Sequence, residues 1–215
     1  MTANEKIAQI RERMKANGIA AVIIPSADPH MSEYVPSRWE GRKWISGFDG
    51  SAGTAVVTLH SAALWTDSRY FIAAEQQLAG TEFQLMRERL DDTPTIPEWI
   101  AQETKDDDST EVGVDGMCMA LSEVEDMKAE LKLLGGLTMR TNLDILERVW
   151  TDRPSVPSDK VNIQPMEYAG EACSDKLDRI RLTVIEDRYK AHRRLNLRVI
   201  YFFGKTGLGK TRYVL

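Results

Sequence analysis

The stretch that decides the fold is Ser46–Leu78, with the sequence SGFDGSAGTAVVTLHSAALWTDSRYFIAAEQQL. Its first nine residues are crowded with glycine, alanine and serine around one aromatic residue and one acid, which is typical of a tight loop. Two short apolar runs follow, AVVTL and AALWT, and only His60 and Ser61 separate them. Such a pair predicts a β-hairpin near residues 55–66. Residues 67–70 then open a predicted helix.

The segments on either side of this stretch alternate between helical and strand patterns. The run Ala20–Ile24 (AAVII) is continuously apolar, as in a buried strand that is covered on both faces. Capping-box patterns predict helix starts at Thr2 and Ser122, and Thr95 with Pro97 at cap and first-turn positions predicts another. Three more strands and a last helix are expected at residues 82–86, 111–114, 137–140 and 143–150. The alternation favours an α/β fold with a mixed β-sheet flanked by helices.

The chain has 215 residues, of which 42% are hydrophobic and 28% are charged, so its composition is that of an ordinary globular protein. It contains no run of 18 apolar residues, so no membrane-spanning helix is expected. The two cysteines are far apart in the sequence and fit a reducing, cytoplasmic environment. Neither they nor the three histidines form a zinc-binding pattern, and we expect no metal ligand and no catalytic residue in this chain.

The net charge of −5 conceals a division along the chain. Residues 182–215 carry eight lysines and arginines against two acids, whereas residues 1–181 carry 20 basic and 31 acidic side chains. The acidic part argues against nucleic-acid binding outside the basic tail. We expect a domain over residues 1–151, a linker at 152–165 with three prolines, the truncated start of a second domain at 166–181, and an incomplete basic segment at 182–215.

Arg69 is the first candidate for a binding residue. It follows a strand directly, beside Asp67 and Tyr70, and a guanidinium there can pair with a carboxylate or with a peptide carbonyl. The simpler alternative is a local salt bridge to Asp67. Asp49, within the glycine-rich loop, is expected to hold a turn. The alternative is a ligand role for this loop, because its glycines permit close approach to the backbone.

A second cluster consists of Asp28, His30 and Glu33 in one loop. Three such side chains suggest a metal site. No second pair of ligands accompanies them, so a capped, solvent-exposed loop is the favoured interpretation.

A strict phosphate-loop motif, G-x-x-x-x-G-K-[ST], lies in the tail after the apolar run VIYFF. Its residues Gly204, Gly207, Gly209, Lys210 and Thr211 are of the types that hold nucleotide phosphates and Mg²⁺. Only four residues follow the motif, without the helix, parallel sheet and acidic strand that such a site needs. ATP and Mg²⁺ are therefore expected as ligands only if this segment were completed.

Five blocks occur in one order along the chain: IIPSADPHMSEYVP, SGFDGSAGTAVV, WTDSRYFIAAEQQL, LDDTP and VWTDRPSVP. Together they resemble the N-terminal domain of Xaa-Pro aminopeptidases (aminopeptidase P), within the creatinase/prolidase group. The resemblance covers roughly residues 3–181. The last stretch, YKAHRRLNLRVIYFFGKTGLGKTRYVL, looks like the start of the helicase segment of replication-initiator proteins.

The first resemblance implies a non-catalytic domain of a cytoplasmic enzyme. Members of this family remove an N-terminal residue that precedes proline, and they bind two divalent metals, commonly manganese, in a C-terminal domain that this chain does not contain. It also implies that Arg69 contributes to the peptide site, across a homodimer. The alternatives are a nucleotide- or DNA-binding fragment led by the tail, and a protein-interaction domain that has lost the family activity.

Overall fold

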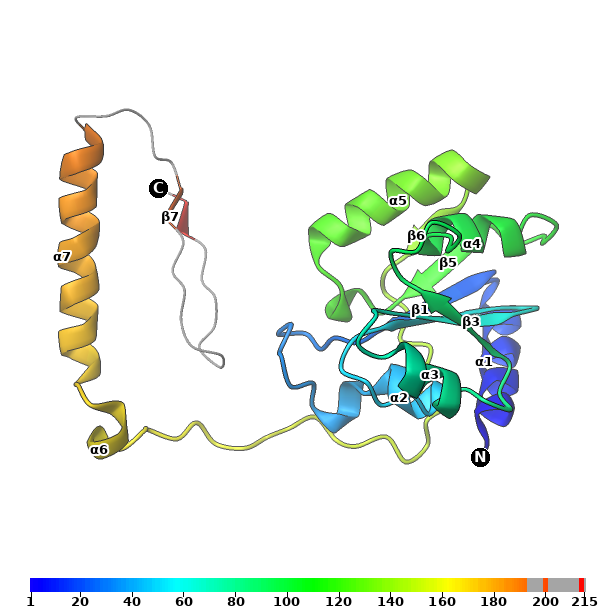
Figure 1. Cartoon of the computed structure of the whole chain (residues 1–215), viewed down its shortest axis with the longest axis horizontal. Helices are drawn as coiled ribbons and strands as arrows, with labels where there is room; N and C mark the ends of the chain where they lie inside the picture. Colours follow the sequence, from blue (N-terminus) through cyan, green and yellow to red (C-terminus); the bar gives the residue numbers. More distant parts are fainter. Residues whose placement is uncertain (193–198, 201–212, 215) are drawn as a thin grey trace. The chain divides into compact units, whose positions relative to one another are not determined.

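The computed structural model describes residues 1–192, 199–200 and 213–214. The chain divides into two compact units, Met1–Val156 and Pro157–Leu215. The first unit consists of a six-stranded sheet with helices on both faces, as Figure 1 shows. This confirms the α/β class and the mixed sheet flanked by helices.

The sheet has the strand order β4-β3-β2-β1-β5-β6. Strand β2 runs antiparallel to both of its neighbours, and every other adjacent pair is parallel. The predicted hairpin is the pair β2–β3, in which Thr54 lies opposite Trp65. The strands are β1 (Ala21–Pro25), β2 (Thr54–Thr58), β3 (Ala62–Thr66), β4 (Phe83–Arg87), β5 (Glu111–Val114) and β6 (Thr138–Arg140).

Two hydrophobic cores lie on opposite faces of the sheet, and β1 contributes to both. Ala21 and Ile23 point into one core, while Val22 and Ile24 point into the other. Successive side chains of a strand point to opposite faces, so an apolar run without alternation is buried on both sides. This confirms the interpretation of AAVII as a doubly covered strand.

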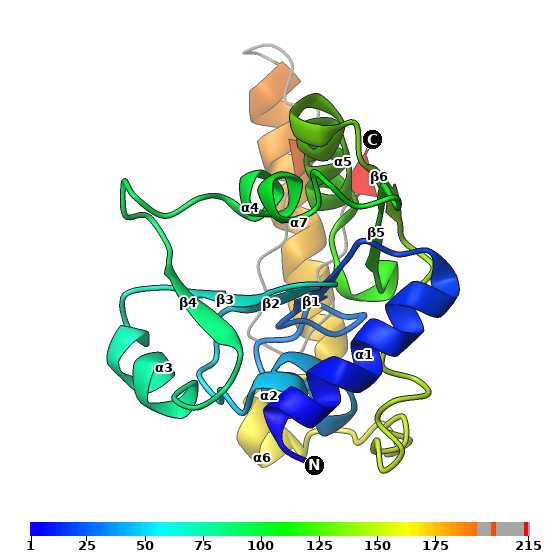
Figure 2. The ribbon, with the colours of Figure 1, turned by 90° about the vertical axis from the view of Figure 1, so that its right-hand side faces the viewer.

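Helices cover each face of the sheet. In Figures 1 and 2, α1 (Ala3–Asn17), α2 (Gly41–Ser46) and α3 (Phe71–Gln77) lie on one side, and α4 (Ile96–Glu103) and α5 (Leu121–Gly135) lie on the other. Two short 3₁₀ turns, η1 (Ser37–Trp39) and η2 (Gly116–Cys118), follow β1 and β5. Within the described part of the chain, no helix is long and apolar enough to cross a membrane.

The predicted capping box at Thr2 is present, and the helix start predicted at Thr95 also carries a capping box. The Thr2 hydroxyl accepts from the Glu5 amide at 3.2 Å, and the Glu5 carboxylate accepts from the Thr2 amide at 2.7 Å. Thr95 and Glu98 form the same pair of bonds at the start of α4. Each such cap contributes about 1 kcal/mol to helix stability, so local sequence determines where these helices begin.

Three local predictions are wrong. The Ser122 box does not form, because the N-cap of α5 is Ala120, two residues earlier, and the Glu123 carboxylate accepts from the Ala120 amide instead, at 3.1 Å. Residues 67–70 form a turn before α3 rather than its first residues, closed by the Tyr70 amide on the Asp67 carbonyl.

The third wrong prediction is the helix at 143–150. These residues form turns, in which the Asp144 carboxylate accepts from the Leu146 amide at 3.1 Å. An aspartate side chain that bonds a nearby backbone amide competes with the helical hydrogen bonds, although the buried positions themselves fall at the spacing of one helical stripe. The buried side chains are Ile145, Leu146, Val149 and Trp150.

The second unit contains two helices, α6 (Met166–Ala169) and α7 (Cys173–His192), and the short antiparallel pair β7 (Val199–Ile200) and β8 (Tyr213–Val214). Gly170 ends α6 with a φ of 73°, in the left-handed region that glycine adopts without strain. The segment at 166–181, expected as the start of a second domain, therefore holds α6 and the first part of α7. Residues 153–165 carry no helix or strand.

Candidate functional site

The carboxyl ends of five parallel strands meet at one edge of the sheet. Because β2 runs the opposite way, the glycine-rich loop that enters it lies at this same edge, and Thr54 pairs with both Pro25 and Trp65. The topology therefore brings the loop at residues 47–53 to the turn at residues 67–70. The candidate site is built from these two segments.

Arg69 lies in this turn with 65% of its side chain exposed. The Asp67 carboxylate accepts from Arg69 Nε at 2.9 Å, from its Nη2 at 2.7 Å and from its backbone amide at 3.0 Å. These bonds hold the pKa of the Asp67 carboxyl below its usual value and raise the pKa of Arg69. Both groups thus remain charged at neutral pH, and the ion pair that the local sequence suggests is present.

The guanidinium carbon Cζ of Arg69 lies over the Tyr70 ring, 5.2 Å from its centroid. The Tyr70 hydroxyl lies 2.7 Å from Ser51 Oγ, and the hydrogen bond between them lowers the pKa of the Tyr70 phenol. The Tyr70 ring also meets Phe48 edge-on, with centroids 6.0 Å apart. The glycine-rich loop therefore contacts the residue on which Arg69 rests.

Arg42 holds the glycine-rich loop from inside. Its guanidinium donates to the Phe48 carbonyl at 2.9 Å, to the Gly50 carbonyl and to the Ser26 hydroxyl. Only 6% of Arg42 is exposed, and burial lowers its pKa to about 10. A charge buried this deeply requires the oxygens that surround it, so the loop and Arg42 stabilise each other.

Asp49 connects the loop to α3. Its carboxylate accepts from the Gln77 side-chain amide at 2.7 Å, and its backbone amide donates to the Gln77 side-chain oxygen at 3.1 Å. Asp49 therefore links the glycine-rich loop to α3. The expected bond to the amides of its own turn is not its contact here.

A hollow of about 210 Å³ lies beside this assembly. The segment after β1 and the glycine-rich loop contribute to its wall, and the wall carries charges of both signs. Ligand pockets for drug-sized molecules are typically 300–1,000 Å³, so the hollow suits a single side chain. Its lining residues are Ser26, Glu33, Tyr34, Val35, Trp39, Glu40, Arg42, Lys43, Asp49, Gly50 and Ser51.

The three side chains of the suggested metal cluster do not come together at one site. Asp28 is fully buried, and one of its oxygens accepts from the His30 and Ser32 amides at 2.6 and 3.4 Å, which caps the loop. His30 is 85% exposed with Nδ1 4.0 Å from that oxygen, and Glu33 lines the hollow instead. Across the described residues, no group of three His, Cys, Asp or Glu side chains is placed to hold a metal ion. The described residues therefore do not fit the two metals that the family resemblance implies.

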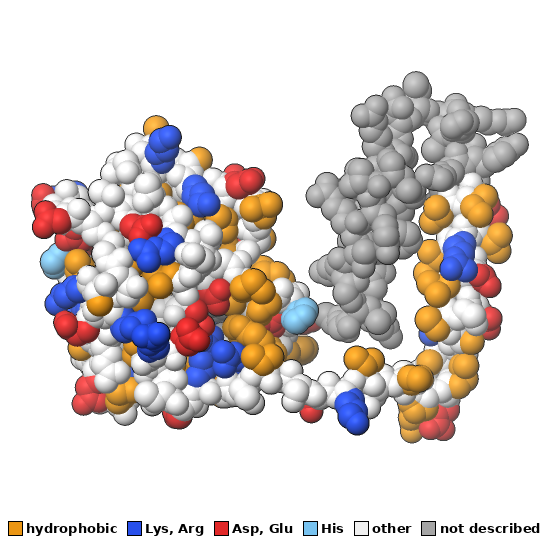
Figure 3. Space-filling model, turned by 180° about the vertical axis from the view of Figure 1, so that it is seen from behind, with side chains coloured by type: hydrophobic (Ala, Val, Ile, Leu, Met, Phe, Trp, Pro, Cys, Tyr) orange, Lys and Arg blue, Asp and Glu red, His pale blue; other side chains and the backbone are white. Residues whose placement is uncertain are grey.

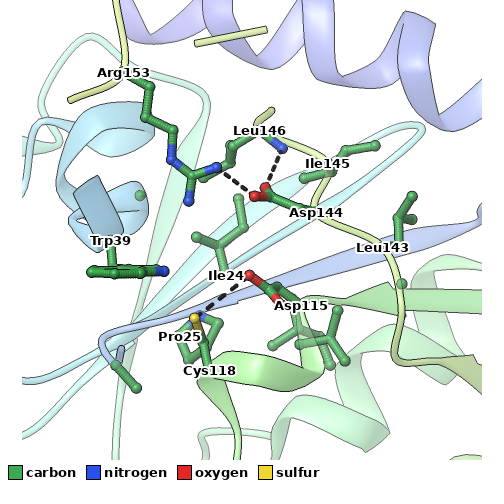
Figure 4. A pocket seen from close by; sticks show the side chains of 15 residues that line it. Ile24, Pro25, Trp39, Asp115, Cys118, Leu143, Asp144, Ile145, Leu146 and Arg153 are labelled. Carbon is green, nitrogen blue, oxygen red and sulfur yellow. Dashed lines mark hydrogen bonds and ion pairs between the residues drawn. The ribbon is translucent and has the colours of Figure 1, made fainter. Parts of the chain in front are cut away.

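A smaller cavity of about 30 Å³ lies where β1 and β5 end (Figure 4). Arg153 forms an ion pair with Asp144 there, and Cys118 Sγ lies 3.6 Å from the Asp115 carboxylate. Burial raises the pKa of the Cys118 thiol to about 12, so the thiol stays protonated and is a poor nucleophile. The cavity has room for one or two waters and not for a peptide.

Sequence reasoning missed three contributors to these sites: Arg42, Ser51 and Arg153. Arg42 sits in an ordinary helical turn, and no pattern marks its role. Arg153 falls in the segment interpreted as a linker, yet its Nε donates to the Arg38 carbonyl at 2.8 Å. The phosphate-loop residues Gly204, Gly207, Gly209, Lys210 and Thr211 lie outside the described residues.

Figure 3 shows charged side chains of both signs over one face of the first unit, with hydrophobic side chains gathered in one area of it. Lys43 with Glu40 and Arg87 with Glu75 are examples of the exposed pairs in that unit, with nitrogen–oxygen distances of 3.1 and 3.3 Å. Such pairs between exposed groups contribute little to stability. This face of the unit is thus mixed in charge rather than strongly basic.

Residues 6–140 match the family model of the creatinase/prolidase N-terminal domain. A probable Xaa-Pro aminopeptidase P of Pyrenophora teres f. teres is 37% identical over 177 residues, which cover 82% of this chain and 26% of that protein. Aminopeptidase P1 of Lotus japonicus is 36% identical over 168 residues, which cover 78% of this chain and 25% of that protein.

The crystal structure of X-prolyl aminopeptidase from Caenorhabditis elegans, a cytosolic enzyme with a di-nuclear active site, superposes with a TM-score of 0.73. Its sequence is 29% identical, and the match covers 87% of this chain and 32% of that one. This chain thus spans about a quarter of the length of the curated relatives that it matches. The fold, the family-model match and these relatives together show that the chain belongs to the creatinase/prolidase N-terminal domain family.

Proposed function

We propose that the first unit is the non-catalytic N-terminal domain of an Xaa-Pro aminopeptidase and that Arg69 is its point of contact with the peptide. Arg69 carries this proposal, because its charged side chain is exposed at the sheet edge and is held in a fixed orientation by Asp67 and Tyr70. The peptide would have proline at its second position, and the protein would act in the cytosol, like the enzyme from C. elegans.

The chemistry of Arg69 suits a peptide carbonyl or a peptide carboxylate. Asp67 occupies Nε and Nη2, and among the described residues Nη1 has no partner. A guanidinium donates hydrogen bonds within its own plane. The N–H groups that Asp67 leaves open can therefore donate to a peptide oxygen. The exposure of Arg69 lets a peptide approach from outside the domain.

In this proposal the metal centre of the family cleaves the peptide bond, and that centre lies outside the described residues. The unit offers no metal cluster within its described part, and its buried cysteine is protonated. Arg69 would therefore serve a peptide that is bound elsewhere in the assembly, such as on a second copy of the protein. The domain orients and admits the substrate in this proposal.

The absence of catalysis is tested directly. The chain is incubated with Mn²⁺ and the tripeptide Ala-Pro-Phe, and released alanine is measured. We expect none above the rate without protein, and measurable turnover would contradict the non-catalytic role.

The role of Arg69 is tested by NMR titration of the chain with Ala-Pro-Phe, observing the side-chain Nε–Hε signal of Arg69. The signal should shift with saturation in the millimolar range, and Arg69→Gln should abolish the binding. Arg87→Gln is the matched control, since Arg87 is a half-exposed arginine at the end of the adjacent strand and pairs with Glu75. Equal loss of binding in both variants, or no shift in the unsubstituted chain, would contradict the proposal.

A further inference from the structure

Arg69 is oriented by two different contacts. Asp67 holds one edge of its guanidinium, and the Tyr70 ring holds its face at 5.2 Å from the centroid. An ion pair between exposed groups adds little order by itself. A flat ring beneath a guanidinium adds a cation–π attraction and restricts the plane in which the guanidinium lies.

The Tyr70 ring is in turn fixed from three sides. Phe48, which is fully buried, meets it edge-on with an interplanar angle of 78°. Ser51 Oγ lies 2.7 Å from its hydroxyl. Gly50 lies so close that a Cβ added there would come within 2.9 Å of Tyr70 Cδ1. The ring therefore has little freedom to turn or tilt.

These contacts reach back into the core. Arg42 donates to the carbonyls of Phe48 and Gly50, and its Cζ lies 4.8 Å from the Phe48 ring centroid. An unbroken series of contacts thus runs from a buried arginine, through the glycine-rich loop and Tyr70, to the exposed Arg69. We call Phe48, Gly50, Ser51 and Tyr70 the arginine support.

We infer that Tyr70 is a positioning residue for Arg69, and that the glycine-rich loop exists at this edge to hold the Tyr70 ring in place. The inference rests on the proposed function of Arg69 in peptide contact. It predicts that the ring matters more than the hydroxyl, because the ring touches the guanidinium and the hydroxyl touches only Ser51. Phenylalanine should therefore replace Tyr70 with little loss, and leucine should not.

The experiment uses the full chain and two readouts. The first is the ¹⁵N order parameter of the Arg69 Nε–Hε group without peptide, and the second is the affinity for Ala-Pro-Phe. Tyr70→Leu should bring the order parameter below about 0.6, the range of flexible groups, and weaken peptide binding about fivefold or more. Tyr70→Phe should keep the order parameter and stay within about twofold in affinity.

Phe71→Leu is the matched control, because Phe71 lies under Arg87 at 5.8 Å and is the next residue along the chain. It should leave both Arg69 readouts unchanged. Should Tyr70→Leu retain the order parameter of the unsubstituted chain, the positioning role is overturned, and a loss in Tyr70→Phe equal to that in Tyr70→Leu also overturns it. If the unsubstituted chain binds no peptide, the proposed function fails, while the order parameters still decide the role of Tyr70.

Discussion

Replacing Gly50 by alanine tests the packing of the arginine support. The new Cβ would lie 2.4 Å from Phe48 Cζ and 2.9 Å from Tyr70 Cδ1, distances that side chains do not tolerate without movement. Phe48 has no exposed surface, so its ring cannot swing outward. Either the ring or the loop that Arg42 holds must shift.

The expected cost follows from this geometry. Forcing additional carbon atoms into a well-packed core costs about 1–3 kcal/mol. For a unit of this size, 1 kcal/mol corresponds to roughly 2–4 °C in melting temperature. Gly50→Ala should therefore lower the melting temperature of the first unit by about 2–12 °C.

Urea unfolding, followed by tryptophan fluorescence, measures this cost, since all five tryptophans lie in the first unit. Gly80→Ala is the control. Gly80 has a φ of +79°, and a Cβ added there would meet no atom within 4 Å, so this variant reports only the cost of a left-handed backbone, about 1 kcal/mol. The two variants separate steric overlap from backbone strain.

A double-mutant cycle with Phe48→Leu decides whether the steric argument is right. Leucine removes the ring atoms that the Cβ would meet. The double variant should therefore lose less unfolding free energy than the two single variants lose together, by about 1 kcal/mol or more. Additivity within about 0.5 kcal/mol would refute the reasoning, because contacting residues are expected to couple.

Three other expectations follow from the contacts described. Arg153→Ala should destabilise the first unit by about 2 kcal/mol in urea unfolding, because it leaves a partly buried carboxylate without its cation. At pH 8, iodoacetamide should label Cys173 quickly and Cys118 only after urea is added, since Cys173 is exposed and the pKa of Cys118 is about 12; two equally fast thiols would contradict this. Ser51→Ala should raise the pKa of Tyr70 toward its usual value, as seen in its ¹³Cζ shift on alkaline titration, because the lost hydrogen bond favours the phenolate; an unchanged pKa would contradict the assignment.

Local sequence patterns predicted the parts of the fold that depend on interactions between residues close together in the chain. The Thr2 and Thr95 capping boxes, the β2–β3 hairpin and the doubly buried β1 all depend on residues close together in the chain. The helix expected at 143–150 failed although its buried side chains fall at helical spacing, because the backbone there forms turns that the Asp144 side chain holds. The pattern thus predicted which side chains are buried, but not the conformation of the backbone.

The candidate site was only partly predictable for the same reason. The ion pair of Arg69 with Asp67 spans two residues and can be inferred from the local sequence. The anchoring of the loop by Arg42 depends on carbonyl oxygens whose positions only the folded chain determines. The contact of Ser51 with Tyr70 likewise requires the hairpin to bring its two ends together.

The reversed direction of β2 has a consequence for how this site can be inherited and engineered. Had β2 run parallel to its neighbours, a crossover of a dozen or more residues would separate it from β3. Instead, the loop before β2 and the turn after β3 belong to one uninterrupted piece of chain, from Phe48 to Tyr70. Closing so short a loop costs little entropy. Arg69 and its support therefore lie within one short segment, and from outside that segment Arg42 anchors it.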